Sequence, residues 1–579
     1  MNTRQLRTFI ALVWKHVFLP LLMCALFLAD APQLIAQERT VGLLLRDSSA
    51  CDGYTLFAPL RSKHTYLIDC DGNLIHSWEG TSTPGEAVYL LDDGSLLRTE
   101  AIYNPVFKAG GGGGRILRLS WDGDLLWSFT YRSDSVIQHH DIEPLPNGNV
   151  LLLAWELKSP QQAIAAGVPE ERVPMDGLYP EHIVEVRPTS TYGGEIVWEW
   201  HLWDHLIQDT DSTGANFGVV SDHPELIDIN APLTGMDPRK ADWWHANSVD
   251  YNPSLDQIMI SVRHHSEVWI IDHSTTTGEA ASHSGGRSGM GGDLLYRFGN
   301  PRSYRPGADS LRMLHDQHDA HWIEDDLPGA GNILLFDNGE TRDPRYSSVE
   351  EFTPPVDSSG SYRMDSSGVF GPTHIAWSYG HAEERRFYAR YMSGAQRLPD
   401  GNTLVCNGPK GDFFEVTPTG SIVWRYVNPV TGEGPLDQGT EPPGSYWSRE
   451  NLAFRCTRIP PDHPGLAGRT LESQGPIERY PSSVRHGNDA HPGAPFLHPN
   501  YPDPFRTSTT IRFTLPGRER VILRVTDVLG RTVAVLLDAE RSAGTHLAHF
   551  NAASLPDGTY FCRLYTSHGV QTQRMLLLQ

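Results

Sequence analysis

The sequence predicts an all-β protein, a six-bladed β-propeller followed by a small immunoglobulin-like β-sandwich. Three observations predict it: two short strand motifs recur over residues 38–458, Asp-Gly or Asn-Gly turns separate the strands, and the composition changes after about residue 458. The 579 residues exceed one average domain, and 39% hydrophobic with 20% charged residues is typical of a folded chain. Because 70 acidic residues face 47 basic ones, no nucleic-acid partner is expected.

The first 36 residues predict an export signal peptide. Arg4, Arg7 and Lys15 precede an apolar run at 17–28, and small residues lead to an expected cleavage near Ala36. No later stretch reaches the roughly 20 apolar residues of a membrane-spanning helix, so a soluble mature chain is expected.

Five cysteines follow the predicted signal peptide. In an oxidising compartment Cys51 could pair with Cys70, and Cys406 with Cys456, leaving Cys562 free. The sequence leaves this pairing open.

Two repeated motifs predict the propeller. The first is a turn followed by an apolar run that ends in an aromatic residue, and it recurs at 71–78, 122–127, 194–198, 292–296, 373–377 and 420–424. The second is a strand, a tight turn and a strand, and it recurs at 86–97, 140–152, 245–260, 318–336 and 393–406, with a degenerate sixth copy at 451–459. Six four-stranded units at such spacing are typical of a propeller. We expect residues 53–78 to pair with the last repeat and close the ring.

The second motif places polar residues at one repeated position. Glu86, His140 and Ser393 each lie eight residues before the glycine of their turn, while His245 and His318 begin equivalent strands whose turns carry insertions. Because propeller blades are arranged radially, we expect these residues to converge on one mouth of the central channel. Three histidines would meet there.

Three imidazoles also suit a zinc or copper site. Arg263, eighteen residues after His245, would however place a fixed cation beside them, which suits an oxyanion and repels a metal dication. Asn247 adds a neutral donor. The sequence therefore favours an anionic substrate at this site, without a metal or another cofactor, and leaves a metal site as the alternative.

Motifs around these residues resemble the bacterial arylsulfate sulfotransferases. They are the runs 243–250, 256–264 and 269–273, the run 139–141 before 147–149, and the run 317–319 before 331–332 and 336–339. The resemblance covers most of residues 85–458. It implies a six-bladed propeller that moves a sulfuryl group from a phenolic sulfate ester to another phenol without a nucleotide donor. It also implies that His318 is the nucleophile and that His140, His245, Asn247 and Arg263 complete the site.

This assignment is chemically coherent. Sulfuryl transfer needs in-line positioning and donors around the equatorial oxygens, and a neutral imidazole is a competent nucleophile. We expect Arg263 and Asn247 to hold the sulfuryl oxygens, and His140 and His245 to serve the departing phenolate and then the acceptor. The histidines His315 and His321 flank His318, so an alignment in the wrong register would select another nucleophile.

Two other functions fit the same sequence. A secreted aryl-sulfate hydrolase would use this site with water as the acceptor, and a non-catalytic propeller would serve only binding or adhesion. A formylglycine sulfatase is not expected, because no Cys-x-Pro-x-Arg motif occurs. The physiological donor and acceptor and the oligomeric state stay open.

The end of the chain predicts a linker and a separate β domain. Residues 459–499 are rich in Pro, Gly, Ser and His, whereas residues 501–579 lack tryptophan, carry nine arginines against six acids and alternate like strands. The runs 500–505, 527–531 and 555–560 resemble the sorting domain read by the type IX secretion system. An immunoglobulin-like adhesion or carbohydrate module is the alternative. The resemblance implies that residues 500–579 direct the protein across the outer membrane, to the medium or the cell surface.

Overall fold

The computed structural model describes residues 39–304, 309–381, 387–442, 450–480, 495–528, 530–567 and 569–578. The predicted signal peptide, residues 1–36, lies outside this range. The chain divides into two compact units, Met1–Pro481 and Ser482–Gln579. Within the described ranges, no helix has the length and apolar character needed to cross a membrane.

Antiparallel sheets make up the larger unit, and strands that follow one another in the chain lie side by side. Turn glycines such as Gly148 (φ 84°) adopt a left-handed backbone that other residues disfavour, which lets the strands reverse tightly. We number the sheets in chain order from the one that contains β2. Sheet 1 consists of β2 (Tyr54–Pro59), β3 (His64–Asp69), β4 (Leu74–Glu79) and β29 (Ala453–Ile459). Sheet 2 consists of β5 (Pro84–Leu90), β6 (Leu96–Ala101), β7 (Gly114–Leu119) and β8 (Leu125–Thr130). Sheet 3 consists of β9 (Val136–Pro144), β10 (Val150–Glu156), β11 (Glu181–Ser190) and β12 (Gly193–His201).

The next three sheets repeat this pattern. Sheet 4 consists of β15 (Ala246–Asn252), β16 (Gln257–Val262), β17 (Glu267–Asp272) and β18 (Tyr296–Phe298). Sheet 5 consists of β19 (His318–Trp322), β20 (Ile333–Asp337), β21 (Ser348–Phe352) and β22 (Trp377–Tyr379). Sheet 6 consists of β23 (Gly394–Arg397), β24 (Thr403–Asn407), β25 (Asp412–Val416) and β26 (Ile422–Val427), and β1 (Gly42–Arg46) adds a fifth strand to it. The prediction of a β fold built from four-stranded antiparallel units is confirmed.

Short insertions decorate these sheets. The helix α3 (Pro160–Ala165) lies between β10 and β11, and α4 (Thr277–Ala280) lies between β17 and β18. Two small strand pairs are β13 (Leu206–Ile207) with β14 (Ile227–Asp228), and β27 (Val430–Thr431) with β28 (Gly434–Pro435). In the described residues, regular helix is therefore confined to short connections.

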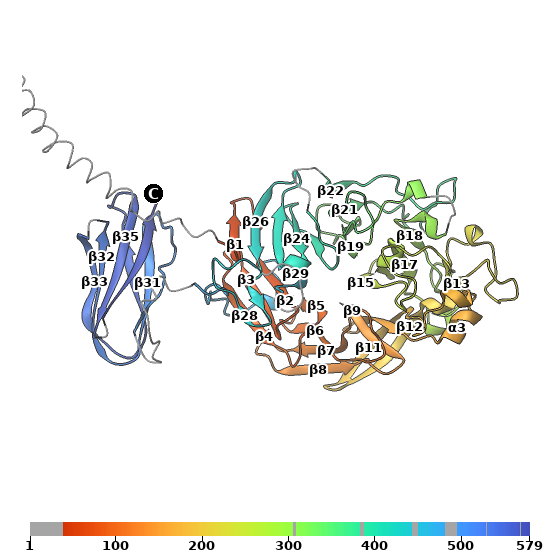
Figure 1. Cartoon of the computed structure of the whole chain (residues 1–579), viewed down its shortest axis with the longest axis horizontal. Coiled ribbons are helices and arrows are strands. Elements are labelled where there is room, and N and C mark those ends of the chain that lie inside the picture. The colour runs from red at the N-terminus through yellow and green to blue at the C-terminus, as the bar shows by residue number, and fades with distance from the viewer. Residues whose placement is uncertain are drawn as a thin grey trace, which may run out of the picture. The chain divides into compact units, whose positions relative to one another are not determined.

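The sheets follow one another around a ring (Figure 1). Their first strands contact one another in the order β5, β9, β15, β19, β23, and β29 contacts both β23 and β5. The late strand β29 pairs with β2, and β1 pairs with β26, so segments from both ends of the unit complete sheets 1 and 6. The predicted pairing of residues 53–78 with the last repeat is thereby confirmed. This closure gives sheets 1 and 6 a neighbouring sheet on each side, which the end sheets of a linear array would lack.

The hydrophobic core lies between neighbouring sheets. Leu97 and Ile116 of sheet 2, for example, pack in one buried cluster with Leu152 and Val184 of sheet 3. Similar clusters join every other pair of neighbouring sheets, so each of the six sheets packs against both of its neighbours.

Residues 460–480 differ from the sequence expectation of a linker over 459–499. Leu466 is buried in the cluster formed by sheets 1 and 2, and the Gln474 amide donates to the Leu74 carbonyl at 2.8 Å. Near the end of this segment the Arg479 amide donates to the Leu436 carbonyl at 2.9 Å. The division between the two units therefore falls after residue 481, because a few apolar side chains anchor a stretch whose composition is mostly polar.

The five cysteines after the predicted signal are free thiols. Neither of the two pairs considered from the sequence forms a disulfide. Cys70 instead donates to the Gly53 carbonyl at 3.1 Å, and burial together with the neighbouring Cys456 raises the pKa of Cys406.

The C-terminal unit contains two antiparallel sheets. One consists of β30 (Phe496–Leu497), β31 (Ser508–Leu515) and β34 (Gly544–Asn551); the other consists of β33 (Thr532–Arg541), β32 (Glu519–Asp527), β35 (Gly558–Thr566) and β36 (Gly569–Leu577). Alternate residues of these strands, among them Phe513, Leu523 and Leu564, share one buried core. The unit thus has a core of its own.

Candidate functional site

His318 is the first residue of β19 and is buried, with both ring nitrogens engaged. The Met392 amide donates to His318 Nε2 at 3.2 Å, so this nitrogen carries the lone pair and Nδ1 carries the hydrogen. Nδ1 donates to Asn338 Oδ1 at 2.7 Å. Burial and the neighbouring Arg263 cation hold the pKa of His318 well below its usual value. The ring is therefore neutral at physiological pH, with Nε2 as its nucleophilic atom.

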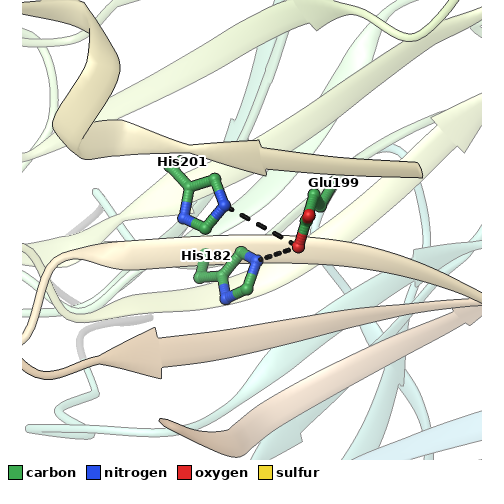
Figure 2. Close-up of side chains that lie close together, drawn as sticks. All are labelled: His182, Glu199 and His201. Carbon is green, nitrogen blue, oxygen red and sulfur yellow. Dashed lines mark hydrogen bonds and ion pairs between the residues drawn. The ribbon is translucent and has the colours of Figure 1, made fainter. Parts of the chain in front are cut away.

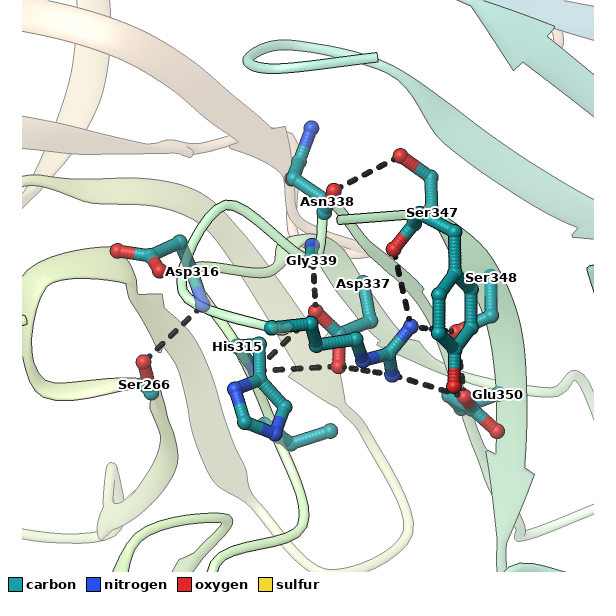
Figure 3. A network of polar contacts seen from close by, with 12 residues as sticks. Ser266, His315, Asp316, Asp337, Asn338, Gly339, Ser347, Ser348 and Glu350 are labelled. Carbon is teal, nitrogen blue, oxygen red and sulfur yellow. Dashed lines mark hydrogen bonds and ion pairs between the residues drawn. The ribbon is translucent and has the colours of Figure 1, made fainter. Parts of the chain in front are cut away.

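Asn338 fixes this tautomer. Its Nδ2 donates to the carbonyls of Ala389 (2.8 Å) and Met392 (3.0 Å), so its Oδ1 must face His318. Figure 3 shows Asn338 in a network that ties together the segments on either side of it: Asp337 accepts from the amide of His315 at 3.1 Å and from Arg342 at 2.7 Å. This network holds the chain before β19 and the chain after β20 together.

The flanking histidines have other partners. His315 contacts the Thr341 hydroxyl at 3.3 Å, and burial with the nearby Arg312 lowers its pKa to about 3. His321 contacts the carbonyl of Asp319 at 2.9 Å. Burial and the charges of Arg263 and His245 lower the pKa of His318, whereas the charges that lower the pKa of His315 are those of Arg312 and Arg342.

His140 and His245 meet edge to face, with ring centroids 4.7 Å apart. Burial is the main cause that lowers the pKa of His140, and the charges of His245, His318 and Arg263 lower it further. Burial and Arg263 likewise lower the pKa of His245. The structure thus brings together the three predicted histidines and Arg263, and keeps the rings neutral.

The three histidines reach this point from different ladder positions, not from the single position expected from the repeat. His140 lies inside a register shift of β9, where its φ is 47°; His245 (φ 53°) precedes the first ladder pair of β15; and His318 forms the first pair of β19. In β19 the left-handed residue is Asp319 (φ 59°). Such strained backbone is common at functional sites, and here it lets unequal strands present their side chains to one centre.

Both outer histidines are oriented by neighbours. His245 Nδ1 lies 2.5 Å from Asp242 Oδ2, and its ring stacks on His264 at 4.8 Å. His140 Nδ1 lies 2.8 Å from Nδ1 of His139, whose Nε2 in turn lies 2.9 Å from Glu181. These contacts leave Nε2 of His140 and of His245 as the ring atoms available to a substrate.

Gly111 covers His140 closely. Its carbonyl accepts from the His140 amide at 2.7 Å, and a Cβ at this position would come within 2.4 Å of several ring atoms of His140. With a φ of 85° as well, only glycine fits here. The glycine-rich segment 110–114 is therefore part of the wall around the histidines.

Arg263 begins the short 3₁₀ turn Arg263–His265 directly after β16 and is half-buried. Its Nη1 lies 3.3 Å from His264 Nε2, its Nη2 lies 3.5 Å from the Arg390 carbonyl, and its Nε has no partner. The charges of Asp316 and Asp242 favour its cationic form against burial, although no described carboxylate lies within ion-pair distance of it. Because the Arg263 guanidinium is charged and uses few of its N–H groups within the protein, its other N–H groups can donate hydrogen bonds to an anion.

Asn247 uses one of its two side-chain N–H groups within the protein. Its Nδ2 donates to the Gln317 carbonyl at 2.8 Å, and its Oδ1 is buried without a partner. The side chain therefore ties β15 to the residue before His318 and keeps one N–H for a ligand.

Two residues that sequence reasoning did not assign complete the centre. Glu86 is held at φ 97°, and its Oε2 lies 3.8 Å from His140 Nε2; burial, with a smaller contribution from Asp141, raises the pKa of this carboxyl to about 8. The repeat alignment already placed Glu86 at the same repeat position as His140, so the sequence held a signal for it.

Arg455 joins three strands at the same centre. It donates to Asp141 of β9 at 2.8 Å and to the Asn247 carbonyl of β15 at 3.0 Å, and it lies 2.7 Å from Asp319 of β19. The only sequence signal for Arg455 was its place in the degenerate repeat copy at 451–459.

Three groups among the described residues have the spacing of metal ligands: Asp242, His245 and His264; His182, Glu199 and His201; and His205, His283 and Asp293. The first group belongs to the site above, where the Arg263 cation opposes a metal dication. The chemistry of the centre therefore suits an anion held by a guanidinium, with three neutral imidazoles and one protonated carboxyl around it.

Comparisons with known proteins give two family matches. Residues 56–429 match the family described as Arylsulfotransferase (ASST), and residues 500–578 match the Secretion system C-terminal sorting domain. The resemblances found in the sequence are thereby confirmed. A search among curated proteins found no match.

Solved structures resemble the chain only weakly. A Bacteroides caccae protein of unknown function is 12% identical, with 70% of this chain and 99% of that chain covered and a TM-score of 0.34. The periplasmic gluconolactonase PpgL of Pseudomonas aeruginosa is 11% identical, with 86% and 99% covered and a TM-score of 0.34. Virginiamycin B lyase from Staphylococcus aureus is 12% identical, with 67% and 85% covered and a TM-score of 0.29. At TM-scores this low the likeness carries no argument about activity.

Proposed function

Because the chain belongs to the arylsulfotransferase family, we propose that it transfers a sulfuryl group from a phenolic sulfate ester to another phenol through a covalent intermediate on His318. The observation that carries this proposal is the tautomer of His318: Nδ1 donates to Asn338, so the neutral ring keeps its lone pair on Nε2, where it accepts the Met392 amide at 3.2 Å and experiences the charge of Arg263. We also propose that the six sheets are the blades of a six-bladed propeller and that the C-terminal unit is an immunoglobulin-like sandwich.

In the first half-reaction His318 Nε2 gives up the hydrogen bond from the Met392 amide and attacks sulfur; an N–S bond forms and the S–O bond to the aryl group breaks. The phenolate leaves with the electron pair of that bond, and the positive charge on the sulfated ring is shared with Nδ1–H, which stays bonded to Asn338. Arg263 and the free N–H of Asn247 stabilise the negative charge on the sulfuryl oxygens. In the second half-reaction the acceptor oxygen attacks sulfur and the N–S bond breaks.

His140 and His245 serve the aryl oxygen. Both rings are neutral, so they hydrogen-bond the departing phenolate and do not act as imidazolium acids at the outset. The proton that the phenolate finally takes comes, in this proposal, from Glu86, whose carboxyl is protonated below about pH 8 and lies beside His140. In the second half-reaction the ionised Glu86 accepts the proton of the second phenol and becomes protonated again.

The sorting-domain match over residues 500–578 implies export by the type IX secretion machinery. We propose that the mature protein acts in the medium or at the cell surface, after the predicted signal peptide has taken it across the inner membrane.

The test uses an aryl sulfate such as p-nitrophenyl sulfate with and without a second phenol. Phenolate release and the sulfated acceptor are measured together. We expect release that depends on the acceptor and an equal yield of sulfated product. Release that ignores the acceptor would identify a hydrolase, and no release would contradict the proposed transfer.

A further inference from the structure

Two histidines and a glutamate lie together on the outer hairpin of sheet 3. His182 of β11 and His201 of β12 are direct cross-strand partners, and Glu199 lies two residues before His201, so the three side chains share one face. The two rings stack with centroids 4.0 Å apart. In this sheet β12 and β9 are the opposite edges, so the cluster is separate from His140 on β9.

We propose that His182, Glu199 and His201 form a binding site for a divalent transition-metal ion, best matched by zinc. His182 Nε2 and His201 Nε2 lie 3.3 Å and 3.7 Å from the same carboxylate oxygen, Glu199 Oε2. Figure 2 shows both rings with these nitrogens turned toward Glu199. Around tetrahedral zinc with bonds of about 2.0–2.2 Å, neighbouring ligand atoms are separated by about 3.3–3.6 Å. The observed spacing is thus close to that of a bound ion.

The remaining ring nitrogens have partners that would orient the ligands. His182 Nδ1 lies 3.2 Å from the Tyr131 hydroxyl, and His201 Nδ1 lies 3.4 Å from Glu156 Oε1. Glu156 is itself held by Lys158 at 2.8 Å. Metal-bound histidines usually donate their second N–H to an oxygen of this kind, which fixes the ring with the other nitrogen toward the metal.

The cluster is open to solvent on one side. The His182 side chain is 4% exposed, whereas those of Glu199 and His201 are 34% and 28% exposed. Three protein ligands with an accessible fourth position, filled by water, match the two-histidine, one-carboxylate sets that bind zinc. An ion there would fasten β11 to β12.

The other outlying group fits less well. His205 Nδ1 and His283 Nδ1 both lie 2.8 Å from Asp293 Oδ1, which is a direct hydrogen-bond distance and shorter than the separation of two ligands across zinc. Its His283 side chain is also highly exposed.

The experiment titrates the chelator-stripped, full-length protein with Co²⁺ and follows the visible absorption of four-coordinate cobalt, then adds Zn²⁺. We expect one equivalent of cobalt to give the bands and zinc to displace it. The bands should be lost in His201→Asn and in Glu199→Gln. They should persist in His223→Asn, a matched exposed histidine 2.9 Å from a carboxylate, and in His245→Asn.

Two further measurements separate a metal site from a plain ion pair. Tyr131→Phe should weaken cobalt binding by about 10- to 100-fold although it removes no ligand. Zinc should raise the melting temperature of the wild type and leave that of His201→Asn unchanged. The proposal is overturned if stoichiometric cobalt gives no bands, if the bands survive in both ligand variants, or if only His283→Asn abolishes them.

Discussion

Replacing Arg263 by lysine keeps the positive charge but removes the planar set of donors. In the structure the guanidinium makes two long contacts, at 3.3 Å to His264 and 3.5 Å to the Arg390 carbonyl, and its Nε has no partner. At most two of its five N–H groups are therefore used by the protein. A lysine ammonium at this place would hold one sulfuryl oxygen at a time, without the fixed fork.

The magnitude follows from these donors. A single donor to a developing oxyanion contributes about 2.7–4 kcal/mol, and a hydrogen bond to a charged group contributes about 1.5–3 kcal/mol. Because the charge itself is retained, we expect a loss of about 2–4 kcal/mol in transition-state stabilisation, or about 30- to 1,000-fold in kcat/KM. The folded state should change little, since neither contact of Arg263 is short.

The assay compares kcat/KM for p-nitrophenyl sulfate at saturating phenol in the wild type, in Arg263→Lys and in Arg239→Lys. Arg239 is an exposed arginine paired with Asp237, so its variant controls for the general effect of the exchange and should keep wild-type kinetics. Wild-type kinetics in Arg263→Lys as well would refute the role given to the guanidinium.

Four other predictions concern Glu86, His318, Asn338 and the C-terminal unit. Burial raises the pKa of Glu86 to about 8, so activity should fall as the pH rises through 8, and Glu86→Gln should be slower and should lack this limb; an unchanged limb would contradict the role of Glu86. The pKa of His318 is lowered, so kcat/KM should not fall as the pH drops through 6.5, and an acid limb at that pH would contradict a buried neutral nucleophile. Asn338→Ala should lose about 2–4 kcal/mol in urea unfolding, because it removes the partners of the buried Met392 carbonyl and of His318 Nδ1, and should slow sulfation of His318. Deletion of 482–579 should leave transfer intact and retain the protein in the periplasm of its host; secretion of the truncated protein would contradict the address function.

The β fold was readable from local signals. Alternating strands and turn glycines such as Gly148 act over a few residues, so the sequence shows them directly. The docking of residues 460–480 was missed, because a few apolar side chains such as Leu466 anchor a segment whose overall composition is that of a linker.

The site was predictable in its residue types and less so in its geometry. His140, His245, His318 and Arg263 were found through motifs, and the structure brings them together. Their different ladder positions depend on register shifts that the sequence does not mark.

The supporting residues depend on distant pairings. Arg455 contacts Asp141 across 314 residues, and the orientation of Asn338 is set by carbonyls more than 50 residues away. The cluster of His182 and His201 lies within one hairpin and requires only the register of β11 against β12. The contacts of Arg455 and Asn338 depend on how separate parts of the chain pack together, and no local pattern predicts them.

The measurement that tests the central claim most directly is the site of covalent sulfation. The protein is incubated with an aryl sulfate alone, quenched and digested, and the peptides are analysed by mass spectrometry. We expect an adduct of about 80 Da on His318, absent from His318→Ala and retained in His315→Ala. An adduct on His315 or His321, or sulfated product formed with no histidine adduct, would contradict the account.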